Sequence, residues 1–79
     1  MQLLAVDTQE KYDSLMGHLE NEGNVWFEDE SKPTDVNNWT EYKEETVIML
    51  NTTLIIHHQN RAYFENVCPD VEIVDYEIR

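Results

Sequence analysis

The segment that most constrains the fold spans residues 46–58, TVIMLNTTLIIHH, where two short apolar runs flank Asn51, Thr52 and Thr53. Both runs contain β-branched residues, and each has the length of an ordinary strand. Asn51 tolerates a positive φ angle, so we expect the chain to reverse tightly there. The segment therefore predicts a central antiparallel hairpin against which the rest of the chain packs.

Residues 8–22 show the clearest helical pattern, because apolar side chains recur there with the spacing of one helix face. The apolar residues on that face are Tyr12, Leu15, Met16 and Leu19. Asp7 followed by Glu10 has capping-box spacing, which predicts that the helix begins just after Asp7. Gly23 predicts its end, because glycine readily adopts the left-handed conformation that closes many helices.

Shorter elements are expected on both sides of the hairpin. Strands are predicted at residues 2–6 and 24–28, and a single helical turn at residues 39–42 follows a loop. After the hairpin, a short helix over residues 61–67 and a last strand over residues 71–78 complete the chain. The short helix is capped by Asn60, and its expected inward residues are Ala62, Tyr63 and Val67.

This order of elements predicts a single α+β domain over residues 1–79. We expect a two-layer sandwich, with an antiparallel or mixed sheet of four or five strands. One long and one short helix are expected on one face of that sheet. A split β-α-β arrangement would place the first and last strands near the hairpin.

The sequence shows no motif for catalysis, for a cofactor or for a metal. His57 and His58 are adjacent on a predicted strand, so their side chains point to opposite faces and are badly placed to share a metal ion. Cys68 has no partner for a CxxC motif or an intrachain disulfide. The chain also lacks a phosphate-binding glycine loop and an EF-hand loop. We therefore expect a protein that is not an enzyme and that binds no cofactor.

Charge is the most unusual property of the chain, with 17 acidic residues, 5 basic residues and a net charge of −12. Such a charge repels nucleic acids and anionic membranes, and it attracts basic protein surfaces. The first residues lack the pattern of a signal peptide, and no apolar run approaches the roughly 20 residues of a membrane span. These features predict a soluble intracellular protein.

The acidic residues are clustered, and the clusters predict a surface for binding a basic partner. The candidate partner-binding residues are Glu28, Asp29, Glu30, Asp35, Trp39, Glu41, Tyr42, Glu44, Glu45, Asp75 and Glu77. Asp75 and Glu77 would lie on one face of a strand about 6.6 Å apart, which resembles every second phosphate of a DNA strand. Trp39 and Tyr42 lie among the carboxylates as candidate interface anchors, although for Trp39 the favoured role is to pack against the hairpin and close the core.

The total charge suits a mimic of DNA. Twelve charges correspond to roughly 20 Å of duplex, and a folded chain of this length is about 30 Å across. The protein thus carries about the charge of the duplex that it could replace in the groove of a DNA-binding protein.

Two residue patterns resemble those of small, acidic and largely uncharacterised proteins from bacteriophages and prophages, mainly of Gram-positive hosts. The first pattern is Tyr12-Asp13-x-Leu15-Met16-x-x-Leu19-Glu20-x-x-Gly23-x-x-Trp26, and the second is Lys32-Pro33-Thr34-x-x-Asn37-x-Trp39-x-x-Tyr42-x-x-Glu45-Thr46. The resemblance covers most of residues 10–76 and implies a phage protein in the host cytoplasm, without catalytic residues. Small acidic phage proteins often inhibit a host enzyme, so the expected function is stoichiometric inhibition of a nucleic-acid-binding protein, with an anti-CRISPR role as the best single candidate.

Two other functions stay open. A small-molecule or nucleotide-binding accessory protein would need a pocket and at least one buried arginine, for which Arg61 is the candidate. A self-associating phage protein would instead form a stable homodimer that hides its acidic face.

Overall fold

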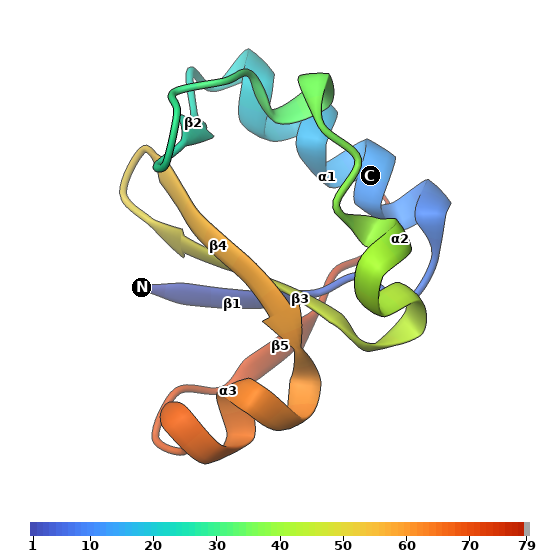
Figure 1. Ribbon diagram of the computed structural model, residues 1–79, viewed down its shortest axis with the longest axis vertical. Helices are drawn as coiled ribbons and strands as arrows, with labels where there is room; N and C mark the ends of the chain where they lie inside the picture. Colours follow the sequence, from blue (N-terminus) through green and yellow to red (C-terminus); the bar gives the residue numbers. More distant parts are fainter. Residues whose placement is uncertain (79) are drawn as a thin grey trace.

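The computed structural model describes residues 1–78, which form a five-stranded sheet with three α-helices (Figure 1). In chain order the elements are β1 (Gln2–Ala5), α1 (Gln9–Asn21), β2 (Val25–Trp26), the 3-10 helix η1 (Pro33–Asp35), α2 (Trp39–Tyr42), the 3-10 helix η2 (Lys43–Glu45), β3 (Thr46–Asn51), β4 (Leu54–Asn60), α3 (Arg61–Val67) and β5 (Ile73–Asp75). This order of strands and helices is the predicted one.

The sheet is mixed, with strand order β2-β4-β3-β1-β5. The central strand β3 runs antiparallel to both of its neighbours, β4 and β1, whereas β2 runs parallel to β4 and β5 runs parallel to β1. The predicted hairpin is confirmed, since Asn51 pairs with Leu54 across a two-residue reversal. The positive φ angle lies at Thr52, at 59°, and not at Asn51 as expected.

Apolar residues on alternate positions of the central strands form two separate cores. Ile48 and Leu50 of β3 belong to the core beneath α1, whereas Val47 of the same strand packs with Phe64 of α3. Successive strand residues point to opposite faces, so α1 and α3 cover opposite faces of the sheet. The predicted α+β class with a mixed sheet is confirmed, but the expectation that both helices share one face is wrong.

Helix α1 ends as expected but begins one residue later. Thr8 is its N-cap, because the Thr8 side chain accepts a hydrogen bond from the Lys11 N–H, and the expected cap Asp7 lies outside. At the other end Gly23 has a φ angle of 85°, in the left-handed region. The N–H groups of Gly23 and Asn24 donate to the carbonyls of Glu20 and Leu19, which is the pattern of a Schellman motif.

Three other elements differ in part from the prediction. Asn60 caps α3 as expected, but the helix buries Phe64 and leaves Tyr63, Ala62 and Val67 exposed. The expected last strand over residues 71–78 shortens to the three residues of β5, which excludes Glu77 from the sheet. The second strand is also shorter than residues 24–28 and holds only Val25 and Trp26. Both short strands lie at the edges of the sheet, where pairing on one side alone supports them.

The folded chain measures 29 × 23 × 23 Å, close to the width expected from its length. Within residues 1–78, no helix combines the length and the apolar character that crossing a membrane requires.

Candidate functional site

A cleft of about 310 Å³ lies between strand β4 and the segment that connects β2 to α2. Its volume is at the lower end of the range typical of ligand pockets. The residues that line it are Trp26, Glu28, Asp29, Ser31, Val36, Asn38, Glu41, Tyr42, Ile56, His57, His58 and Gln59. Four of the predicted partner-binding residues, Glu28, Asp29, Glu41 and Tyr42, are thereby brought to one place.

A β-bulge in β4 determines which side chains line the cleft. Leu50 pairs with Ile55 and Met49 pairs with His57, so Ile56 is the extra residue. The bulge shifts the alternation of side chains, so that His58 lies on the same face as Ile55. His57 consequently contacts Tyr63 and Phe64 on the opposite face, and the two histidines point apart as predicted.

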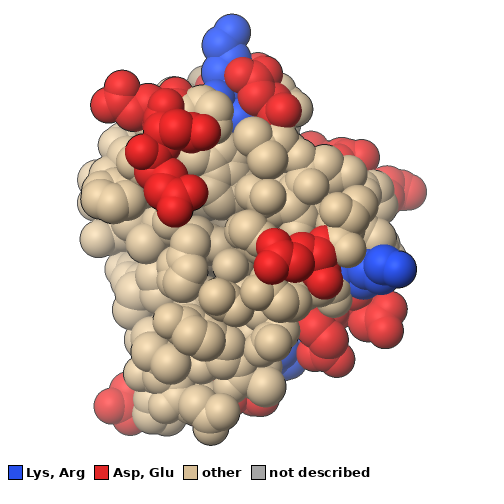
Figure 2. Space-filling view, in the orientation of Figure 1, with Lys and Arg blue, Asp and Glu red and all other residues tan. Residues whose placement is uncertain are grey.

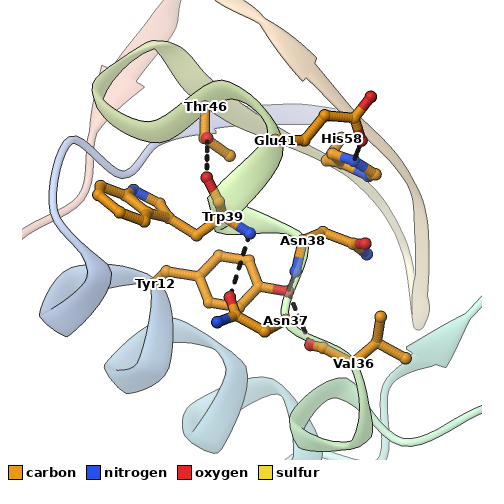
Figure 3. A network of polar contacts seen from close by, with 8 residues as sticks. All are labelled: Tyr12, Val36, Asn37, Asn38, Trp39, Glu41, Thr46 and His58. Carbon is orange, nitrogen blue, oxygen red and sulfur yellow. Dashed lines mark hydrogen bonds and ion pairs between the residues drawn. The ribbon is translucent and has the colours of Figure 1, made fainter.

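His58 is the central side chain of the cleft. Its Nε2 lies 2.8 Å from the Glu41 carboxylate (Figure 3). Its ring also lies against the rings of Trp26 and Tyr42, with centroids 6.1 and 5.7 Å away. The hydrogen bond from His58, followed by one from Tyr42, lowers the pKa of Glu41 below the ordinary glutamate value. Glu41 is therefore held as a carboxylate that faces an aromatic surface.

The far wall of the cleft is anchored to α1 by Tyr12. The Tyr12 hydroxyl donates to the Val36 carbonyl at 3.0 Å and accepts from the Asn38 N–H at 3.0 Å (Figure 3). The pKa of Tyr12 is raised, mainly because the side chain is buried. The hydroxyl therefore stays protonated and continues both to donate and to accept a hydrogen bond. The loop before α2 is thus held in place by the core.

Trp39 also helps to hold this segment against the core, and it does not line the cleft. Its indole N–H donates to the Val6 carbonyl at 3.0 Å, and its ring packs against the core beneath α1. The alternative in which Trp39 closes the core is therefore the one that the contacts favour, whereas Tyr42 lines the cleft.

The mouth of the cleft carries two further carboxylates. Asp29 accepts hydrogen bonds from the Ser31 hydroxyl at 2.7 Å and from the Ser31 N–H at 3.1 Å. The hydroxyl contact, followed by the N–H contact, lowers the pKa of Asp29. Glu28 is its exposed neighbour on the same loop, and no lysine or arginine is among the residues that line the cleft.

The remaining predicted residues are spread over other parts of the surface. Glu30, Asp35, Glu44 and Glu45 are exposed and do not line the cleft. Asp75 and Glu77 border a different hollow of about 530 Å³ between α1 and β5, at the opposite edge of the sheet. Figure 2 shows the carboxylates of one face in separate groups with an uncharged area between them. The acidic residues of that face therefore do not form one continuous stripe.

Two cleft residues were missed by sequence reasoning as binding candidates. His58 was interpreted only as a poor metal ligand, and Trp26 was named only within the first of the two residue patterns. The indole N–H of Trp26 is buried without a hydrogen-bond partner among the described residues. The sequence offered one usable signal, an aromatic residue next to an acidic loop. The described residues contain no cluster of three or more His, Cys, Asp or Glu side chains able to hold a metal ion.

In comparisons with protein-family models, curated proteins and solved structures, the chain matches none of them. The phage resemblance thus depends on the two residue patterns alone.

Proposed function

We propose that this protein is a phage-encoded inhibitor that binds a basic, nucleic-acid-binding protein of the host cytoplasm stoichiometrically. A CRISPR effector is the best single candidate for that target. The observation that carries the proposal is the convergence of Glu28, Asp29 and Glu41 on one aromatic cleft that no lysine or arginine lines. Carboxylates in this arrangement are suited to lysine and arginine side chains that otherwise bind phosphates.

The charge of the whole molecule supports this function. A net charge of −12 attracts a positively charged groove over distances longer than a contact and accelerates the encounter. The carboxylates form separate groups and not a continuous stripe, so the protein would mimic the phosphates of DNA only over a short part of its surface. The cleft would contribute the specific contacts, and the remaining carboxylates would steer the approach.

The structure lends less support to a nucleotide-binding protein. Arg61 is the cation that such a function would use, but it is partly exposed and lies 3.3 Å from Asp75. A nucleotide is anionic, and the cleft that contains Tyr42 and His58 is bordered by carboxylates. We therefore carry forward the inhibitor as the single proposal.

The proposal is tested by capture of CRISPR effectors and other DNA-binding proteins of the host on the immobilised protein, with DNA as competitor. The cleft variant combines Glu28→Gln, Asp29→Asn and Glu41→Gln. The control variant combines Glu30→Gln, Asp35→Asn and Glu45→Gln, which removes the same charge outside the cleft.

We expect DNA to displace the captured partner, and the cleft variant to bind it roughly tenfold more weakly than the control does. Equal losses in both variants would assign the effect to net charge and remove the cleft from the proposal. A captured partner that DNA does not displace would refute the mimicry.

A further inference from the structure

The side of β4 that lines the cleft is an open sheet edge. Strand β2 pairs only with Leu54 and Ile55, and the Phe27 N–H donates to the Ile55 carbonyl where that pairing ends. From Ile56 to Asn60, β4 has no strand on this side within residues 1–78. An edge of this kind is a template for one more strand.

The pairing of β3 shows which backbone groups of this edge are free for a partner. The Thr46 carbonyl accepts from the Val6 N–H, so the backbone groups of Thr46 face β1. The backbone N–H and carbonyl groups of successive strand residues point in alternate directions, so the groups of Ile48, two residues after Thr46, also face β1. The residue opposite Ile48 is His58, whose N–H and carbonyl therefore point away from β3 toward the open edge.

We propose that an extended, lysine- or arginine-containing segment of the partner adds to this edge as a further strand and pairs with the backbone of His58. This inference depends on the proposed function, because it specifies how the basic partner binds. Main-chain hydrogen bonds would supply affinity, and the side chains on alternate positions of the segment would supply specificity. Glu41 and the Glu28-Asp29 pair lie within the same cleft to receive the cationic side chains.

Two features distinguish this edge from a protected one. Residues 56–60, with the sequence IHHQN, contain no lysine or proline of the kind that natural edge strands use to prevent pairing. The unpartnered indole N–H of Trp26, which lines the cleft, is a donor that an incoming carbonyl could satisfy after a small movement.

Charge favours a basic segment over a second copy of the chain. Two copies paired edge to edge through β4 would bring their Glu28, Asp29 and Glu41 side chains close together. Like charges placed close to each other across an interface oppose association. A cationic strand in the same position would instead be attracted by these carboxylates.

The test uses a synthetic peptide of alternating lysine and valine as the probe, added to the isotope-labelled full chain. A matched peptide has the same sequence and charges but carries N-methyl groups on its central residues, so that neither of its edges donates hydrogen bonds. We expect the first peptide to shift the amide signals of residues 56–60 and to slow hydrogen exchange at His58. The N-methylated peptide should bind up to roughly tenfold more weakly, because the hydrogen bond from a peptide N–H to the His58 carbonyl is lost.

A pair of variants tests the same edge from the side of the protein. His58→Pro removes the outward N–H without removing a bond to β3, whereas His58→Ala removes only the side chain. Binding of the first peptide should fall further in His58→Pro than in His58→Ala. If His58→Pro does not fold, the comparison of the two peptides on the unmodified protein decides.

Equal binding of the two peptides, or no binding of either, would overturn the strand addition. A dimer in solution that His58→Pro disrupts would also overturn it, because a second copy would then occupy the edge. If strand addition fails while the cleft variant still weakens a complex that DNA displaces, the proposed function survives without it.

Discussion

At the scale of single residues, Thr52 occupies a position that suits it poorly. It is β-branched and has a φ angle of 59°, which asparagine and glycine adopt far more readily. We expect Thr52→Asn to raise the free energy of unfolding by about 0.5–1 kcal/mol. Thr53→Asn is the control, since Thr53 is not among the residues with a positive φ angle. Urea unfolding would show a gain at position 52 only, and an equal gain at both positions would contradict the explanation.

The pair of His58 and Glu41 gives a second prediction at this scale. The pKa of Glu41 is lowered in the folded chain, so its contribution to stability is complete above the unfolded value of 4.5. That contribution disappears as the pH falls through the lower folded pKa. Glu41→Gln should therefore be less stable than the natural chain near neutral pH and equally stable in acid. A stability difference that does not change with pH would contradict it, and His58→Ala should return the Glu41 pKa toward 4.5 in an NMR titration.

Residue-level errors in the sequence prediction share one physical cause. Asp7 and Thr8 are both good N-caps, and the predicted cap lies one residue before the observed one. Asn51 likewise lies beside two threonines, and the predicted position of the positive φ angle is one residue before the observed one. Only tertiary pairing selects between such neighbours. The end of α1 was predicted correctly, because Gly23 is the only glycine near it and no other residue there adopts the left-handed conformation as easily.

At the scale of elements, the burial of Phe64 is the clearest difference between sequence and structure. Phe64 is fully buried against β1 and β3, whereas Tyr63 remains 36% exposed. We expect Phe64→Ala to cost about 3–5 kcal/mol of stability and Tyr63→Ala about 1 kcal/mol. Thermal unfolding would measure both, with Phe64→Leu as a milder variant if Phe64→Ala does not fold. A larger loss at Tyr63 would restore the orientation of α3 predicted from the sequence.

The bulge in β4 explains why much of the cleft could not be predicted. The two apolar runs within residues 46–58 predict a hairpin, the adjacent histidines predict opposite faces, and both predictions hold. Which histidine faces which helix depends on the extra residue Ile56, and no local pattern marks it. The acidic loop at Glu28 and Asp29 was predicted, but its proximity to Glu41 follows from the pairing of β2 with β4.

At the scale of the whole molecule, the two acidic regions separate because β2 and β5 occupy opposite edges of the sheet. The sequence predicts both regions but not the strand order that divides them. Net charge, by contrast, follows from composition alone and acts on the entire fold. The longest dimension of 29 Å is about the distance over which charges interact at 0.01 M salt. At that ionic strength nearly all carboxylates repel one another.

Salt should therefore change stability and binding in opposite directions. Between about 0.01 and 0.1 M NaCl the screening length falls from roughly 30 to 10 Å, which removes long-range repulsion within the folded chain. We expect the urea midpoint to rise over this range and then to level off, while the affinity for a basic partner falls over the same range. Stability that decreases with salt would mean that attractive pairs such as Lys11 with Asp7 outweigh the repulsion. Affinity that does not change with salt would refute electrostatic attraction as the basis of binding, because screening weakens every long-range pair of opposite charges.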